Sequence, residues 1–192
     1  MELILQNIDT HVHLTTEEQR LFLSKTETLF VKSKTIVQTP NKVATEIYFV
    51  NHGLLRSFSV TDGIVEHVLQ FACEGWWIAD MYSFISEKKG NLFIEVFEDS
   101  EVVVLNKENR DLLYEKIPKL ERFFRILAEN SLVTHQERLI DNLSITAEER
   151  FDKFCKKYPT LIQKVPQKHI ASYIGVTPEF FSKMKAKMLH KK

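Results

Sequence analysis

The chain has 192 residues, of which 44% are hydrophobic and 27% are charged, and its formal net charge is zero. This composition is typical of a folded protein and excludes disordered and collagen-like chains. No apolar run is long enough to span a bilayer, and the N-terminal sequence MELILQ lacks the basic residues of a secretory signal. We therefore expect a cytoplasmic protein with no membrane partner.

The cysteines exclude one class of metal site, and the charge distribution indicates a kind of partner. Cys73 and Cys155 are too few and too far apart for a four-cysteine zinc or iron–sulfur site. The segment 165–192 contains six lysines and one glutamate, a net charge of +5, so the rest of the chain carries −5. This asymmetry indicates an anionic partner for the C-terminal segment, although a basic run can also be a solvated surface.

The first half of the chain has the pattern of a short helix followed by strands. Thr15 and Glu18 have the spacing of a capping box at a helix start. Between residues 35 and 106, five runs rich in β-branched and aromatic residues are separated by turn residues, and Asp62-Gly63 is the strongest hairpin signal. We expect an antiparallel sandwich or jelly-roll barrel.

A long helix is predicted after Pro118, which suits a first helical turn. The helix has two apolar lines, so one is expected to pack on the strands and the other on a second copy of the chain. A helix buried within one subunit is the alternative. The candidate dimer positions are Leu120, Phe124, Leu127 and Ser131, and the second line is Leu132, Leu139 and Leu143.

The C-terminal segment predicts a helix-turn-helix. Thr146 and Glu149 form a second capping-box pattern, and Pro159 ends that helix. A short helix then ends at Gly175, and Thr177-Pro178 starts the next helix. Two helices joined by a three-residue turn containing glycine are typical of this DNA-binding unit.

Helical periodicity divides the last helix into an apolar and a polar side. Phe181, Met184 and Met188 fall on one side, while small and basic residues fall on the other. Small residues allow a helix to enter the major groove, and lysines reach phosphates or base edges. The candidate DNA-binding residues are Thr177, Glu179, Ser182, Lys183 and Lys187.

The sequences YFVNHGLLRSFSVTDGIVEHVLQFACEGWWIAD and IASYIGVTPEFFSKMK, separated by a long helix, resemble the Crp/Fnr family of transcription regulators. The resemblance implies an α+β protein with a cyclic nucleotide-binding-like jelly-roll barrel at 1–116, a dimerisation helix at 117–143 and a helix-turn-helix domain at 144–192. It also implies a homodimer that binds double-stranded DNA at a palindromic operator, with RNA polymerase as a further candidate partner. Glu179 and Lys183 match the family's base-reading pair, and Thr177 and Ser182 would lie near phosphates.

Two departures limit the resemblance. Members that bind cyclic AMP carry an Arg-Ser pair where this chain has Gly90-Asn91, and only Asp80 matches the family's acidic ribose contact. We expect cyclic AMP not to bind in the usual manner, with Lys88 or Lys89 as the alternative anion contact. The family's two-stranded wing has no room before Lys192, so a full wing is not expected.

No enzyme motif stands out, so we expect neither catalytic residues nor a cofactor, and any effector is unknown. His11-Val12-His13 has no third ligand near it, and we predict no metal site. A stand-alone ligand-binding or interaction module, and a cupin-like metalloenzyme, are the alternative functions. Candidate effector-pocket residues, which could equally be core, are Phe71, Trp77, Asp80, Tyr82 and Asn91.

Overall fold

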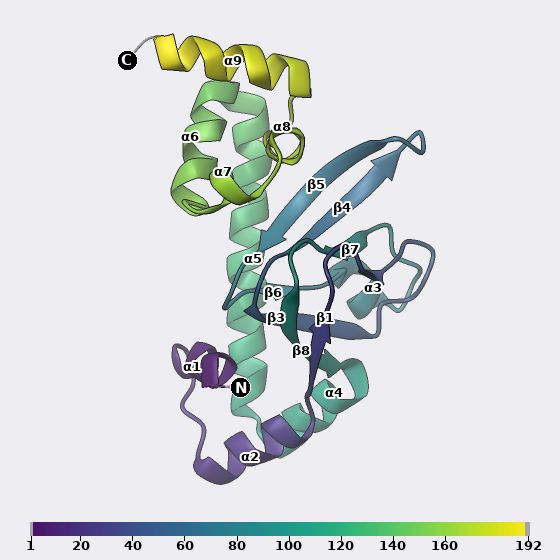
Figure 1. Cartoon of the computed structure of the whole chain (residues 1–192). Helices are drawn as coiled ribbons and strands as arrows, with labels where there is room; N and C mark the ends of the chain where they lie inside the picture. The colour runs from purple at the N-terminus through teal and green to yellow at the C-terminus, as the bar shows by residue number, and fades with distance from the viewer. Residues whose placement is uncertain (1, 191–192) are drawn as a thin grey trace. The chain divides into compact units, whose positions relative to one another are not determined.

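The computed structural model describes the backbone of residues 2–190 and the side chains of residues 2–188. In this part of the chain two helices precede the strands, α3 interrupts the strands, and a run of helices follows them, which is an α+β arrangement (Figure 1). The elements are α1 (Glu2–Asp9), α2 (Thr16–Ser24), β1 (Glu27–Val31), β2 (Ile36–Gln38), β3 (Glu46–His52), β4 (Leu55–Thr61), β5 (Val65–Ala72), β6 (Trp77–Ile78), α3 (Met81–Ser86), β7 (Phe93–Val96), β8 (Ser100–Asn106), α4 (Lys107–Lys116), α5 (Lys119–Ser144), α6 (Ala147–Lys157), α7 (Leu161–Lys164), α8 (Gln167–Ile174) and α9 (Pro178–His190).

The chain divides into two compact units. The first contains the residues up to Ser59 together with Gln70–Glu129, and the second contains Val60–Leu69 together with the residues from Asn130 onward. The borders fall inside β4, β5 and α5, so these three elements are shared. The compact units are defined by contacts, whereas the segments 1–116, 117–143 and 144–192 stay a prediction about function.

The strands form two four-stranded sheets. Their orders are β1-β8-β3-β6 and β2-β7-β4-β5. A long ladder joins β3 to β8 in antiparallel register, with Phe49 opposite Val103. The expected hairpin turn is present, because Asp62 and Gly63 have φ values of 54° and 70°, the left-handed conformation that a tight primed turn requires. The predicted antiparallel barrel is confirmed.

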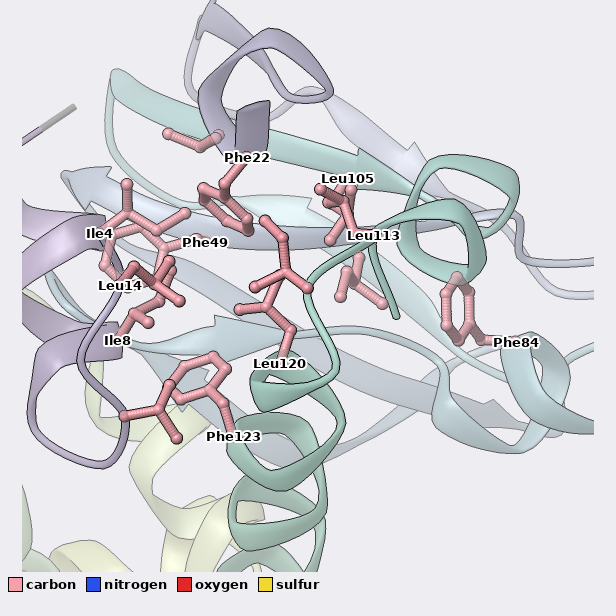
Figure 2. Packing of buried hydrophobic residues seen from close by; sticks show 14 of the residues in the cluster. Ile4, Ile8, Leu14, Phe22, Phe49, Phe84, Leu105, Leu113, Leu120 and Phe123 are labelled. Carbon is pink, nitrogen blue, oxygen red and sulfur yellow. The ribbon is translucent and has the colours of Figure 1, made fainter. Parts of the chain in front are cut away.

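Alternation along β3 supplies side chains to two cores. Tyr48 and Val50 belong to a cluster that joins the two sheets, together with Leu55 and Ile94. Phe49 points to the other face of its sheet, because successive side chains of a strand alternate. There it packs with α1, α2, α4 and the first turns of α5, as Figure 2 shows for Phe22, Leu113, Leu120 and Phe123.

The helical part of the second unit is built around aromatic contacts. Helix α6 starts at the predicted capping box, in which Thr146 and Glu149 exchange hydrogen bonds. Phe151 on α6 meets Phe181 on α9 edge to face, with ring centroids 5.1 Å apart. Phe154 on α6 lies 5.3 Å from Tyr173 on α8. These contacts fix the two helices of the helix-turn-helix on α6.

Candidate nucleic-acid interface

The turn between α8 and α9 is held by local hydrogen bonds. Gly175 adopts φ 75° and ψ 38° at the end of α8, and its left-handed conformation suits glycine. The amide of Val176 then donates to the carbonyl of Ala171 at 3.0 Å. The hydroxyl of Thr177 accepts from the amide of Phe180 at 3.2 Å, which caps the first turn of α9. The start of α9 is therefore fixed by its own sequence.

Helix α9 buries one side and exposes the other. Phe181 is fully buried and Met184 is 5% exposed, whereas Met188, expected on the same side, is half-buried. The opposite side is exposed over two turns. It carries all five candidate DNA-binding residues, namely Thr177, Glu179, Ser182, Lys183 and Lys187.

The exposed side of α9 can make the contacts that a major groove requires. Lys183 and Lys187 follow Glu179 in one i, i+4 row, so donors and an acceptor lie along a single line. Ser182 donates its hydroxyl to the carbonyl of Pro178 at 3.0 Å, which keeps that side chain close to the helix. Ala186 is also small and exposed, so the helix can approach a surface closely. Lys191 and Lys192 lie outside the described residues.

Phe180 was missed by the sequence analysis. Its side chain is 52% exposed, while the neighbouring Phe181 is fully buried. It follows directly after Glu179 in the first turn of α9. Among the described residues from α6 to α9, it is the one large hydrophobic side chain that is exposed. The sequence held a signal, because two consecutive residues of a helix point 100° apart, so Phe180 lies away from the centre of the side that buries Phe181.

The candidate effector residues differ in their exposure. Phe71 is fully buried and Tyr82 is 57% exposed. Trp77 donates from Nε1 to Oδ1 of Asn7 at 3.0 Å and packs 5.2 Å from Phe49 and 5.3 Å from Phe124. Two hollows of the described part, of 140 and 350 Å³, are lined by other residues.

Asp80 and Asn91 do meet, but through the backbone. Asp80 is 1% exposed. Its Oδ2 accepts from the amides of Asn91 and Leu92, each at 3.2 Å, and its Oδ1 accepts from the amide of Ser83 at 3.1 Å. The carboxylate therefore caps α3 and holds the loop after it. Its hydrogen-bonding capacity is largely used within the chain, where the resemblance had implied a ribose contact.

Helix α5 presents different sides along its length. Leu120 is fully buried, and Phe124 and Leu127 pack against the same cluster, so its own chain already contacts this line. Ser131 is exposed. The exposed apolar residues of α5 lie further along, on the second predicted line and beside it. They are Leu132, Val133, Leu139, Ile140 and Leu143.

Within 2–190, no helix combines the length and the apolar character needed to cross a bilayer. In the same range, no group of three or more His, Cys, Asp or Glu side chains is placed to hold a metal ion. His13, from the His11-Val12-His13 sequence, instead contacts the carboxylate of Asp9 at 2.8 Å.

Solved structures share this fold. The c-di-GMP responsive global regulator CLP of Xanthomonas campestris aligns with a TM-score of 0.74 and 15% identity over 92% of this chain and 93% of that one. A transcriptional regulator of the Crp/Fnr family from Eubacterium rectale aligns with a TM-score of 0.71 and 16% identity over 93% and 85%. The catabolite activator protein of Thermus thermophilus aligns with a TM-score of 0.59 and 20% identity over 93% and 85%.

These likenesses establish the fold. The barrel, the long helix and the helix-turn-helix follow one another as in Crp/Fnr regulators, and they cover nearly the whole chain. No family model and no curated protein matches the sequence. The predicted Crp/Fnr resemblance is confirmed at the level of the fold.

Proposed function

We propose that the chain is a sequence-specific DNA-binding regulator of transcription that acts as a homodimer. The observation that carries this proposal is the exposed side of α9, where Glu179, Ser182 and Lys183 lie opposite the buried Phe181 and Met184. The N-terminal residues of such a helix contact base edges when the helix enters the major groove. The fold shared with Crp/Fnr regulators supports the same conclusion.

The exposed side chains at the start and along the open side of α9 have different roles in this proposal. Lys183 would donate to base edges, with Glu179 accepting from a cytosine amino group, because these groups distinguish base pairs in the major groove. Thr177, Ser182 and Lys187 would contact the phosphate backbone. Phe180 adds an apolar contact, and the apolar group that a base pair offers in the major groove is the 5-methyl group of thymine.

In this proposal the exposed apolar residues of α5 form the dimer interface. Leu132, Leu139 and Leu143 lie within about 40° of one another on the helix at 100° per residue, and Leu143 is 82% exposed. Burying such a stripe against a second copy removes apolar surface from water. A two-fold dimer would bind two half-sites about 34 Å apart, and such a regulator would act beside RNA polymerase.

The barrel has no assigned effector in this proposal. Cyclic AMP is not expected to bind in the usual manner, because Gly90-Asn91 offers no guanidinium and Asp80 is committed to three backbone amides. A guanidinium and a hydroxyl are what hold a cyclic phosphate where the family binds it. A titration of the protein with cyclic AMP by calorimetry should therefore give no heat of binding.

The test of the DNA-binding proposal is selection of duplexes from a random pool, followed by affinity measurements over a salt series. A palindrome should be enriched, and its affinity should fall steeply with salt. Lys183→Ala should reduce the preference for the palindrome over random DNA. Replacing Lys191 and Lys192 by alanine should instead weaken all duplexes similarly and reduce the salt slope by about two. No DNA binding at low salt would reject the proposal and favour an interaction module.

A further inference from the structure

The tip of the β4–β5 hairpin is bound to helix α8 inside the second unit. Val60–Leu69 form one compact unit with the residues from Asn130 onward. Strand β5 is the last strand of its sheet, and an edge strand presents backbone groups that need partners or cover. Ser172 on α8 and Arg138 on α5 supply such partners. We call this group of contacts the hairpin clasp. It consists of the side chains of Ser172 and Arg138 and the backbone groups that they bond in Glu66–Leu69 and Tyr173.

Ser172 forms two hydrogen bonds with β5. Its hydroxyl donates to the carbonyl of Glu66 at 2.6 Å and accepts from the amide of Val68 at 2.9 Å. A neighbouring strand would bond the edge of β5 in the same alternating way. One serine side chain of α8 thus takes the place of a strand residue. The adjacent turn of α8 adds His169, whose Nδ1 lies 3.4 Å from Oε2 of Glu66.

Arg138 joins β5 to the C-terminal turn of α8, next to Ser172. Its guanidinium donates to the carbonyls of Val68 at 2.8 Å and Tyr173 at 2.7 Å, and also to the carbonyl of Leu69. It lies 4.1 Å from the centroid of the Tyr173 ring. The carbonyls at a helix C-terminus have no partner inside the helix, and a cation there is stabilising. Burial lowers the pKa of this guanidinium, because the charged group loses contact with water. The three carbonyls and the ring replace part of that lost hydration.

The position of α8 determines the position of α9. The two helices are joined by the turn at Gly175 and Thr177, which is held by backbone hydrogen bonds. Strand β5 begins in the second unit and ends in the first, where Ala72 belongs to the core between the sheets. The same strand is therefore part of the barrel core and a bonded neighbour of α8.

We propose that Ser172 and Arg138 are positioning residues for DNA recognition, which hold α8 on strand β5 so that the recognition helix α9 follows the barrel strand. This inference rests on the proposed DNA-binding function. It assigns the hairpin tip to the DNA-binding part of the protein.

The experiment uses the full chain with Ser172→Ala, which removes both hydrogen bonds to β5 without adding volume. Ser172→Thr keeps the hydroxyl, and Ser144→Ala is the matched control, because Ser144 donates only to the carbonyl of Ile140 in its own helix. Hydrogen exchange at the Val68 amide reports the clasp. The ratio of affinities for the selected palindrome and for random DNA reports the position of α9.

Ser172→Ala should accelerate exchange at Val68 and reduce the preference for the palindrome about tenfold, the effect of losing one or two net hydrogen bonds. Ser172→Thr should restore the preference, and Ser144→Ala should change neither quantity. Arg138→Lys should behave as Ser172→Ala does, because an ammonium cannot bond three separated carbonyls with the geometry of a guanidinium.

Two results would overturn the inference. Faster exchange at Val68 with an unchanged preference would mean that Ser172 covers only a strand edge. Unchanged exchange would mean that the clasp does not hold the strand. In both cases DNA binding by the unmodified protein would leave the proposed function intact, whereas loss of all salt-dependent DNA binding in the unmodified protein would reject the function and the inference together.

Discussion

The carboxylate of Asp80 occupies the space beside Gly90 that any larger side chain would need. An ideal Cβ on Gly90 would lie 2.1 Å from Oδ2 of Asp80 and 3.0 Å from Cβ of Ser83. The same Oδ2 accepts from the amides of Asn91 and Leu92. The glycine is therefore required by the loop closure that Asp80 makes.

We expect Gly90→Ala to destabilise the protein by about 1–3 kcal/mol, the usual range for an added group in a closely packed site. The carboxylate would have to move, and it would then lose amide partners that a buried charge needs. Urea unfolding followed by tryptophan fluorescence measures the effect. Lys89→Ala, at an exposed neighbouring position, is the control, and equal stability of the two variants would contradict this account of Gly90.

If the exposed apolar residues of α5 form the dimer interface, a charge placed among them should disrupt the dimer. Leu143→Glu places a charge at the C-terminal end of the stripe, on its most exposed residue. Burying an unpaired charge is costly, so the dimer should dissociate to monomers. Light scattering after size-exclusion chromatography measures the mass. Ile64→Glu is the matched control, because Ile64 is 85% exposed in the turn between β4 and β5 and does not belong to the stripe on α5. A Leu143→Glu protein that stays dimeric would show that the copies meet elsewhere.

The structural features that depend on residues close together in the chain could be predicted from the sequence. Both capping boxes, the Asp62-Gly63 turn and the left-handed Gly175 are present as expected. Each depends on residues within four positions of one another, where backbone geometry restricts the choice of residue. The exposed side of α9 was predictable for the same reason, since a helix fixes which residues share a side.

Contacts between distant residues were not predictable. The β4–β7 register places Arg56 opposite Glu95, and their side chains pair at 2.6 Å. Glu66 on β5 lies near His169 on α8. No periodicity in the sequence indicates that β5 and α8 lie together, because the residues that join them are about a hundred positions apart.

The second capping box gives a prediction with a definite pH dependence. Hydrogen bonds from the amide and hydroxyl of Thr146 hold the pKa of Glu149 below its ordinary value of 4.5. A carboxyl with a lowered pKa stabilises the folded state above its unfolded pKa, and this contribution is lost as the pH falls through the folded value. Thr146→Ala should therefore lower the melting temperature at neutral pH. The difference from the unmodified protein should shrink in acid, as calorimetric scans can measure, and a difference that grew in acid would contradict this sign.

The exposed phenyl ring of Phe180 predicts a contact with one particular group on DNA. If the ring packs against a thymine methyl group in the major groove, then replacing that thymine by uracil removes the contact and leaves the hydrogen-bonding edges of the base pair unchanged. The unmodified protein should lose about fourfold in affinity at one position of each half-site, the effect of one methyl group no longer buried. Phe180→Ala should bind the thymine and uracil duplexes equally. Lys187→Ala, whose expected partner is a phosphate, should bind both more weakly and keep the fourfold difference. A uracil effect that persists in Phe180→Ala would show that another side chain reads the methyl group.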